Sequence, residues 1–328
     1  MANRDSIELG SGARFPTIGF GLWKIDPANT AEMVFEAIKA GYRHLDAACD
    51  YGNEAEAGIG IRRAIDEGLC SREELWVTSK LWNTYHRPEH VRPAIDRSLN
   101  DLGLEYLDLY LMHFPLATKY VDFEDRYPPG WIFDPNCENP KMEPDSVPLA
   151  TTWGAMESLQ ESGLTKHIGI CNFGCSLIRD LLATAKIRPA VLQVESHPYL
   201  VQANLLRYCE QEGIAYTAFS PLGAGSYIEL GMAAQQDVVL GERLVSDIAE
   251  KHGKTPAQVV LRWGVQRGTS VIPKTSRIER LAENIGIYDF NLTAEEMNLI
   301  SGLDKYRRFN DPGDFCEPNF GQFFPIYD

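Results

Sequence analysis

The strongest constraint on the fold is a regular alternation of short apolar runs and longer amphipathic segments. Each apolar run has the length of a buried strand, and a stretch with apolar residues at helical spacing follows it. The eight expected strands are residues 17–22, 44–48, 75–80, 107–113, 167–172, 191–195, 215–220 and 270–274. Eight βα units that close on themselves form a barrel, whereas an open doubly wound sheet more often stops near six strands. We therefore expect one α/β domain over residues 1–328, a (β/α)8 TIM barrel.

The expected helices lie between these strands. They are residues 31–40, 54–67, 90–102, 153–162, 176–185, 203–212, 242–252 and 279–285. Asn29 and Thr30 are of residue types that cap helices, and they precede the first helix. Thr255 followed by Pro256 begins another segment with helical periodicity.

Three segments exceed a minimal barrel. Residues 7–15, with Gly10, Ser11 and Gly12 at the turn, predict a hairpin that plugs the bottom of the barrel. Residues 114–150 form a long loop after the fourth strand. A capped helix at 293–302 leads into a C-terminal tail, 305–328, which we expect to be aromatic rather than helical. Catalytic barrels carry their sites where the strands end, so we expect loop and tail to fold over that face.

Composition limits the classes of partner. Apolar residues at 44% and charged residues at 23% fit a globular protein, and a net charge of −15 disfavours nucleic acid and anionic membranes. The seven cysteines are an odd number without a CxxC pair, which disfavours a disulfide framework. No apolar leader or uninterrupted run of about 18 apolar residues occurs. We expect a cytoplasmic protein with reduced thiols.

Four polar side chains are expected at strand ends on the active face: Asp46, Tyr51, Lys80 and His113. A phenol, with a usual pKa of about 10, donates a proton near neutrality more readily if a lysine cation stabilises the phenolate and lowers that pKa. A carboxylate would hold the lysine, and a neutral histidine would donate a hydrogen bond to a carbonyl oxygen as charge develops there. The set fits proton donation by Tyr51 to a substrate carbonyl.

Six motifs follow one another along the chain: GYRHLD at 41–46, YGNE at 51–54, SKLWN at 79–83, LMHFP at 111–115, IGICNF at 168–173 and IPK at 272–274. In sequence and order they resemble the aldo-keto reductases. Within that family, residues 113–117, 127–130 and 308–312 are most similar to the xylose reductases. The resemblance implies reduction of an aldehyde by hydride from C4 of a reduced nicotinamide, with Tyr51 as general acid and no metal.

The resemblance also implies a cofactor site without a Rossmann sheet. No GxGxxG follows a strand, and Gly58 and Gly60 are interpreted as helix-packing residues. By resemblance the nicotinamide would contact Cys171, Asn172, Gln193 and Phe219, the pyrophosphate Ser220, Leu222 and Gly223, and the adenosine Lys274, Thr275, Ser276, Arg280 and Asn284. The family usually has serine at the first of these positions and tyrosine at the fourth.

The expected cofactor is NADPH. Lys274 and Arg280 supply two cations for a 2′-phosphate near the start of the last barrel helix. Glu229 stands where dual-specificity xylose reductases carry an acid that accepts from NAD ribose hydroxyls, so NADH remains possible.

By resemblance, the substrate would be an open-chain, xylose-like aldose. Its pocket would be lined by Trp23, Asp50, Trp82, Phe114, Trp131 and Asn310. The carboxylate and the amide in this set would orient sugar hydroxyls. Gly313 replaces a tryptophan of several xylose reductases, which would open the far wall of the pocket.

Alternatives remain at this point. A reductase of aldose 6-phosphates, such as mannose 6-phosphate, or a broad aldehyde reductase would use the same scaffold. A non-catalytic barrel acting as a binding subunit would be expected to lose one of the four strand-end residues, and all four are present. The seven histidines offer no HxH or HExxH motif for a metal hydrolase, and we expect His86 and His90 on a solvated face. Both a monomer and a homodimer fit the family.

Overall fold

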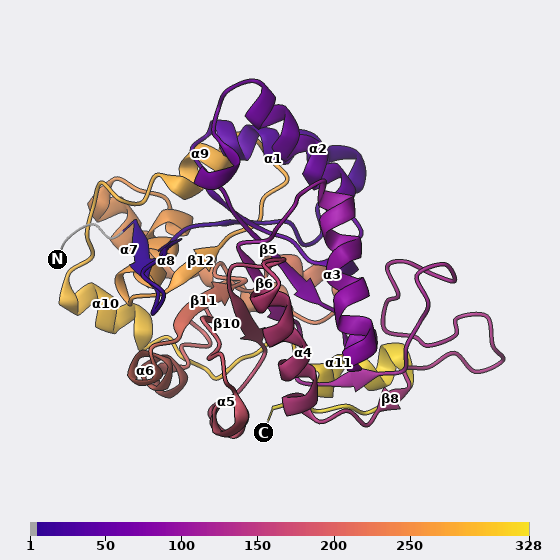
Figure 1. Cartoon of the computed structure of the whole chain (residues 1–328). Coiled ribbons are helices and arrows are strands. Elements are labelled where there is room, and N and C mark those ends of the chain that lie inside the picture. Colours follow the sequence, from indigo (N-terminus) through magenta and orange to yellow (C-terminus); the bar gives the residue numbers. More distant parts are fainter. Residues whose placement is uncertain (1–4, 328) are drawn as a thin grey trace.

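Eight parallel strands form the central sheet of the computed structural model, which describes residues 5–327 (Figure 1). In order around the sheet they are β3 (Phe20–Gly21), β4 (His44–Asp46), β5 (Trp76–Leu81), β6 (Leu109–Met112), β9 (Ile168–Cys171), β10 (Val191–Glu195), β11 (Ala215–Phe219) and β12 (Ser270–Ile272). The two edges meet through a parallel bridge between Ile18 and Val271, and Gly19 N donates to Val271 O at 2.9 Å. The predicted (β/α)8 barrel is confirmed.

Helices surround the strands and bury their apolar faces against them (Figure 1). The helices of the βα units are α1 (Pro27–Lys39), α2 (Glu54–Asp66), α3 (Pro88–Leu102), α4 (Leu149–Glu161), α5 (Cys175–Thr184), α6 (Ala203–Glu212), α8 (Pro256–Gln266) and α9 (Glu279–Ile285). A further helix, α7 (Arg243–His252), precedes α8. Short 3-10 turns occur at Cys49–Tyr51, Arg72–Glu74, Asn83–Tyr85, Ala224–Ser226, Ile228–Leu230, Gln235–Asp237 and Val239–Gly241.

Of the two predicted N-terminal helix caps, the one of α8 is confirmed and the one of α1 is wrong. Thr255 caps α8, because its side chain accepts from Gln258 N and Pro256 occupies the first turn. The expected cap of the first helix at Asn29 and Thr30 is wrong. Asp26 is the cap, and its carboxylate accepts from the backbone N–H of residue 28 at 2.8 Å, so the helix begins at Pro27.

The two glycines of α2 are packing residues, as predicted. A Cβ on Gly58 would lie 2.3 Å from Leu102 O of α3, and one on Gly60 would lie 2.5 Å from Ala31 O of α1. Hydrogen at these positions therefore lets α2 approach both neighbouring helices closely.

The N-terminal hairpin covers the ends of the strands opposite the active face. Strands β1 (Ser6–Glu8) and β2 (Arg14–Pro16) pair antiparallel. Phe15 is fully buried, with its ring centroid 5.0 Å from that of Trp76 at the start of β5. Ser11 Oγ lies 2.9 Å from Nε2 of His167, just before β9. The predicted plug is confirmed.

The long loop after β6 and the tail lie against each other (Figure 1). The loop contains a short antiparallel pair, β7 (Ala117–Thr118) and β8 (Pro144–Asp145), and Met142 N donates to Phe320 O of the tail at 2.8 Å. The expected helix after the barrel is α10 (Ala294–Ser301), capped by Thr293.

The expectation of a non-helical tail is wrong. Residues Pro312–Phe320 form α11, which begins with Asp311 accepting from Gly313 N at 2.8 Å. It ends at Gly321 with a φ of 65°, the left-handed conformation that glycine adopts without strain. An aspartate before proline, and a glycine nine residues after that proline, are ordinary helix signals, which the aromatic content of the segment obscured.

Among residues 5–327, no helix is both long enough and apolar enough to span a lipid bilayer.

Candidate active site

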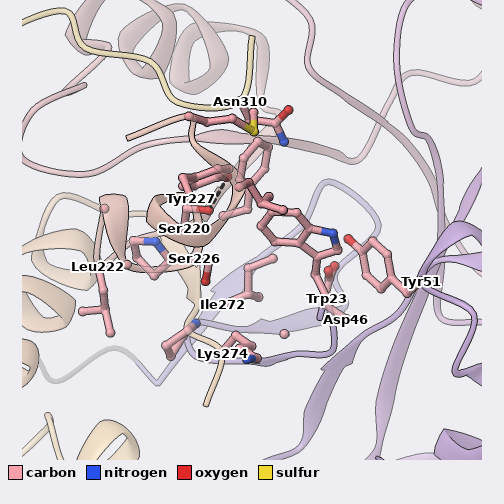
Figure 2. Close-up of a pocket in the computed structure, with 18 of the residues that line it drawn as sticks. Trp23, Asp46, Tyr51, Ser220, Leu222, Ser226, Tyr227, Ile272, Lys274 and Asn310 are labelled. Atoms are coloured by element: carbon pink, nitrogen blue, oxygen red, sulfur yellow. Dashed lines mark hydrogen bonds between the residues drawn. The ribbon is translucent and has the colours of Figure 1, made fainter. Parts of the chain in front are cut away.

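A cavity of about 700 Å³ opens where the strands of the barrel end. Its lining comes from the ends of the barrel strands, from the long loop, from residues 220–240 and from the tail. In Figure 2, Tyr51 and Asp46 lie on one side of the cavity and Leu222 on the other, with the Trp23 ring beside Tyr51. A site at this end of a (β/α)8 barrel agrees with the general placement of function in the fold.

Lys80 lies fully buried beneath the cavity and joins three oxygens. Its Nζ donates to Asp46 Oδ1 at 2.7 Å, to Ala47 O at 2.8 Å and to Tyr51 OH at 3.0 Å. Strand β5 carries the lysine and neighbouring strand β4 carries the aspartate, so sheet register brings them together. The cation is thus balanced by one carboxylate while it still faces the phenol.

The Tyr51 pKa differs from the expectation. Burial raises the pKa of this phenol well above its usual value, and Asp46 and Asp50 raise it further. The expected net lowering is wrong for this geometry, because burial and the two carboxylates outweigh the stabilisation of the phenolate by the Lys80 cation. Tyr51 is consequently a neutral phenol, able to donate its proton.

His113, which follows β6, faces Tyr51 across the cavity with ring centroids 6.0 Å apart. Its Nδ1 lies 3.1 Å from Asp50 Oδ1, although the approach lacks hydrogen-bond geometry. Trp82 stands edge-on to the imidazole at 5.3 Å. The ring is therefore packed in place, and its Nδ1 has no hydrogen-bond partner among residues 5–327.

Three amide and thiol side chains lie next to this group. Gln193 Nε2 donates to Asp46 Oδ2 at 2.6 Å, and Cys171 lies buried behind it. Asn172 donates through Nδ2 to His113 O at 2.9 Å and has a φ of 65°. Gln193, Asn172 and Phe219 line the cavity, whereas the thiol does not reach it.

The loop after β11 borders the cavity. The Ser220 and Tyr227 hydroxyls form a hydrogen bond of 2.7 Å, which is the dashed line in Figure 2. Lys24, from the loop after β3, donates to Ser226 O at 3.0 Å and forms an ion pair with Glu229. These contacts fasten residues 224–229 across the cavity mouth, and they engage the acid expected to accept from a ribose.

Three cations lie at the end of the cavity formed by the residues that follow β12. Lys274, Arg277 and Arg280 line it together with Thr275 and Ser276. None of the three cations forms an ion pair with a carboxylate within the described residues. Asn284 lies buried on α9, outside the lining. Lys274 precedes α9, whose first residue is Glu279, so it lies in the loop rather than on the helix.

Aromatic rings form the wall beside Tyr51. Trp82 is edge-on to Trp131 at 4.9 Å, and its Nε1 donates to Gly130 O of the long loop at 3.0 Å. Phe114, Phe315 and Phe320 complete this wall. The last two come from α11, which also carries Gly313, so helix side chains cover the side expected to be open.

The structure brings nearly all expected site residues to one cavity. Asp46, Asp50, Tyr51, Trp23, Trp82, His113, Phe114, Trp131, Asn172, Gln193, Phe219, Ser220, Leu222, Gly223, Lys274, Thr275, Ser276, Arg280 and Asn310 line it. Lys80, Cys171, Glu229 and Asn284 do not.

Sequence reasoning missed other lining residues, among them Tyr227, Arg277, Phe315 and Phe320. The arginine had a signal in the spacing of three between successive cations at 274, 277 and 280. The two phenylalanines required α11 to be recognised as a helix.

The histidine expectations are partly wrong. His86 is buried rather than solvated, and burial lowers its pKa to about 3. His90 is stacked on Tyr120 with centroids 3.6 Å apart. Within residues 5–327, no three histidine, cysteine, aspartate or glutamate side chains gather as metal ligands.

The lining of the cavity suits an elongated anionic cofactor with one aromatic end. Lys274, Arg277 and Arg280 line the cavity, and so do the Asn172 and Gln193 amides with Phe219. Cations are the groups that would hold phosphates, and amides beside an aromatic ring are the groups that would hold a carboxamide-bearing ring. The residues therefore fit a nicotinamide dinucleotide phosphate, lying between the basic end and Tyr51.

The closed parallel barrel with this Asp–Tyr–Lys–His group at its cavity defines a barrel enzyme of the oxidoreductase class. Residues 17–305 match the Aldo/keto reductase family, and the chain belongs to it.

Individual relatives cover almost the whole chain. The NAD(P)H-dependent D-xylose reductase of Aspergillus niger is 48% identical over 98% of this chain and 99% of its own. The NADPH-dependent D-xylose reductase of Meyerozyma guilliermondii is 49% identical over 94% and 98%, respectively. The structure of the aldose reductase from Schistosoma japonicum matches with a TM-score of 0.85 at 35% identity, over 98% of this chain and 99% of that one.

Proposed function

We propose that this enzyme reduces the aldehyde of an open-chain, xylose-like aldose to the alditol, using NADPH and, less well, NADH. The observation that carries the proposal is the Tyr51 hydroxyl, held at 3.0 Å from the Lys80 cation on the wall of a cavity with a basic far end. Relatives named as NAD(P)H-dependent and NADPH-dependent D-xylose reductases support the substrate and the cofactor.

In this proposal Tyr51 is the general acid. As the carbonyl carbon gains a hydride, its oxygen becomes an alkoxide, a base strong enough to take a proton from a phenol of raised pKa. The phenolate left behind lies 3.0 Å from the Lys80 ammonium, which stabilises it. Asp46 keeps that ammonium in place. His113 donates to the carbonyl oxygen and orients it toward Tyr51.

NADPH, when bound, would supply the hydride from its reduced nicotinamide. Asn172 and Gln193 are assigned to its carboxamide and Phe219 to the face of its ring. Lys274, Arg277 and Arg280 are assigned to its phosphates. The fastening of residues 224–229 by Lys24 keeps the cofactor in the cavity and water out of it.

A neutral sugar is favoured over a sugar phosphate. The substrate end presents aromatic rings, the Asp50 carboxylate and the Asn310 amide, and no lysine or arginine lines it among the described residues. A phosphate placed there would meet Asp50 without a compensating cation.

We also propose that residues 1–328 act as one domain and that the protein works in the cytoplasm. The family match over residues 17–305 and one large core cluster that extends from residue 18 to residue 300 support a single domain. All seven cysteines are free thiols, which supports a reducing compartment.

The test is an initial-rate assay that follows loss of reduced cofactor with D-xylose and with mannose 6-phosphate, each with NADPH and with NADH. We expect faster turnover of xylose and a preference for NADPH. Preference for the phosphorylated sugar would refute the neutral pocket.

Tyr51→Phe is expected to lower kcat by about 10²- to 10⁴-fold, the usual contribution of a positioned general acid, while NADPH binding stays within about twofold. Tyr306→Phe, at a tail residue 85% exposed, is the matched control. Unchanged kcat in Tyr51→Phe would remove this residue from the acid role.

A further inference from the structure

The last described residue of the chain reaches back to the active face. The Tyr327 hydroxyl donates to Asn172 Oδ1 at 2.9 Å, across 155 residues of sequence. Asn172 lines the cavity, and Tyr327 lies behind it, outside the lining. The tail therefore touches the site from the protein side rather than from the side of the ligand.

Two further residues, Glu195 and Arg308, hold the tail in the position that brings Tyr327 to Asn172. The fully buried Glu195, at the end of β10, accepts from Phe309 N and Asn310 N at 2.8 Å each. The Arg308 guanidinium stacks on the Tyr327 ring at 3.5 Å from its centroid. Both ends of the tail are thus attached to strand ends of the barrel, with α11 between them.

The Asn172 side chain is fixed from both sides. Its Nδ2 donates to His113 O at 2.9 Å, and its Oδ1 accepts from Tyr327. The His113 carbonyl can only accept, so it selects the orientation that places the amide nitrogen on its side, and the Tyr327 hydroxyl then holds the amide oxygen by donating to it. The second N–H points at the Cys171 thiol, with Nδ2 3.4 Å from Sγ, and sulfur is only a weak acceptor that a ligand oxygen can replace. With the remaining lone pair of Oδ1, the amide can still offer one donor and one acceptor to a carboxamide.

We propose that Tyr327 is a positioning residue for the cofactor: it fixes the Asn172 amide in the orientation that binds the nicotinamide carboxamide, so the C-terminal end of the chain completes the site. This rests on the proposed use of a nicotinamide cofactor. Without the Tyr327 hydroxyl, the oxygen side of the amide loses its hydrogen bond and only the donation to His113 O holds the group, so the amide can rotate away from the orientation that binds the carboxamide.

The test compares two ligands by calorimetry. NADPH carries the nicotinamide, whereas adenosine 2′,5′-bisphosphate carries only the phosphate-bearing adenosine end. Tyr327→Phe retains the ring under Arg308 and removes only the hydroxyl. We expect NADPH to bind about 3- to 10-fold more weakly, the usual effect of one neutral hydrogen bond, and the bisphosphate to bind unchanged. Tyr306→Phe should change neither affinity.

A double-mutant cycle isolates the route through Asn172. Asn172→Gly removes the amide and tolerates the positive φ at this position. In that background Tyr327→Phe should no longer affect NADPH binding, because the group that it positions is gone. Additive losses would overturn the proposal, since Tyr327 would then act by another path.

Equal weakening of NADPH and the bisphosphate by Tyr327→Phe would mean that the tail only stabilises the fold, which would overturn the inference. Unchanged affinity for both would also overturn it. The substrate and the positioning role are tested separately. If the wild-type protein binds NADPH but does not reduce xylose, only the proposed substrate is refuted. Selective weakening of NADPH binding by Tyr327→Phe would then still support the positioning role.

Discussion

Glu54 makes the stability of the protein depend on pH in a direction opposite to that of most carboxylates. It is the first residue of α2, 3% exposed, and accepts from Ser79 Oγ at 2.6 Å and Ser98 Oγ at 2.9 Å. Burial raises the pKa of this carboxyl from 4.5 to about 7, although both hydroxyls favour the charged form. Replacement by glutamine keeps the shape and removes the ionisation.

The sign follows from proton linkage. Between pH 4.5 and 7 the folded protein holds a proton at Glu54 that the unfolded chain has released, so this group lowers the free energy of unfolding as pH rises. At about 1.4 kcal/mol per pKa unit, the full effect is about 3 kcal/mol and is reached above pH 7. Below pH 4.5 both states are protonated and the effect vanishes.

The assay is urea unfolding of wild type and Glu54→Gln at several pH values from 5 to 8.5. From pH 5 to pH 8.5 the variant should gain about 2 to 3 kcal/mol relative to wild type, because only wild type loses stability through this group. The exposed Glu89→Gln variant controls for removal of a carboxylate. A stability difference between wild type and Glu54→Gln that stays constant with pH would refute the reasoning.

Two further predictions concern the cofactor and the helix packing. Arg280→Ala should weaken NADPH binding by about 10-fold or more and NADH binding by less than about twofold, measured as Kd, and equal losses would mean that this cation does not bind the 2′-phosphate. Gly58→Ala should lower the free energy of unfolding by about 1 to 3 kcal/mol, because its Cβ would collide with Leu102 O. Gly154→Ala, where nothing lies within 4 Å, should leave it unchanged or raise it, and a similar loss at both glycines would show that close packing is not the cause.

The barrel and the four strand-end residues could be predicted because their signals are local. A buried strand such as β5 is six consecutive buried residues, and Lys80 follows from its place near the end of that strand. The contact of Lys80 with Asp46 then follows from parallel register, since adjacent strands end at the same face.

Contacts that join distant segments could not be predicted in this way. His86 lies among polar residues in sequence, yet the fold buries it, and only tertiary packing decides that. The pKa of Tyr51 depends on how burial compares with the Lys80 charge, which sequence order does not give. The Tyr327 contact with Asn172 also required coordinates, because no pattern links the end of a tail to one particular strand.

The bridge between Ile18 and Val271 closes the barrel with its first and last strands, and this has a consequence for synthesis on the ribosome. Until residues 270–272 have left the ribosome, β3 has a neighbour on one side only, and its other edge is an unpaired strand. Fragments that end before β12 are therefore expected to associate through that edge, and a stop codon upstream of residue 270 should yield insoluble protein rather than a smaller folded one.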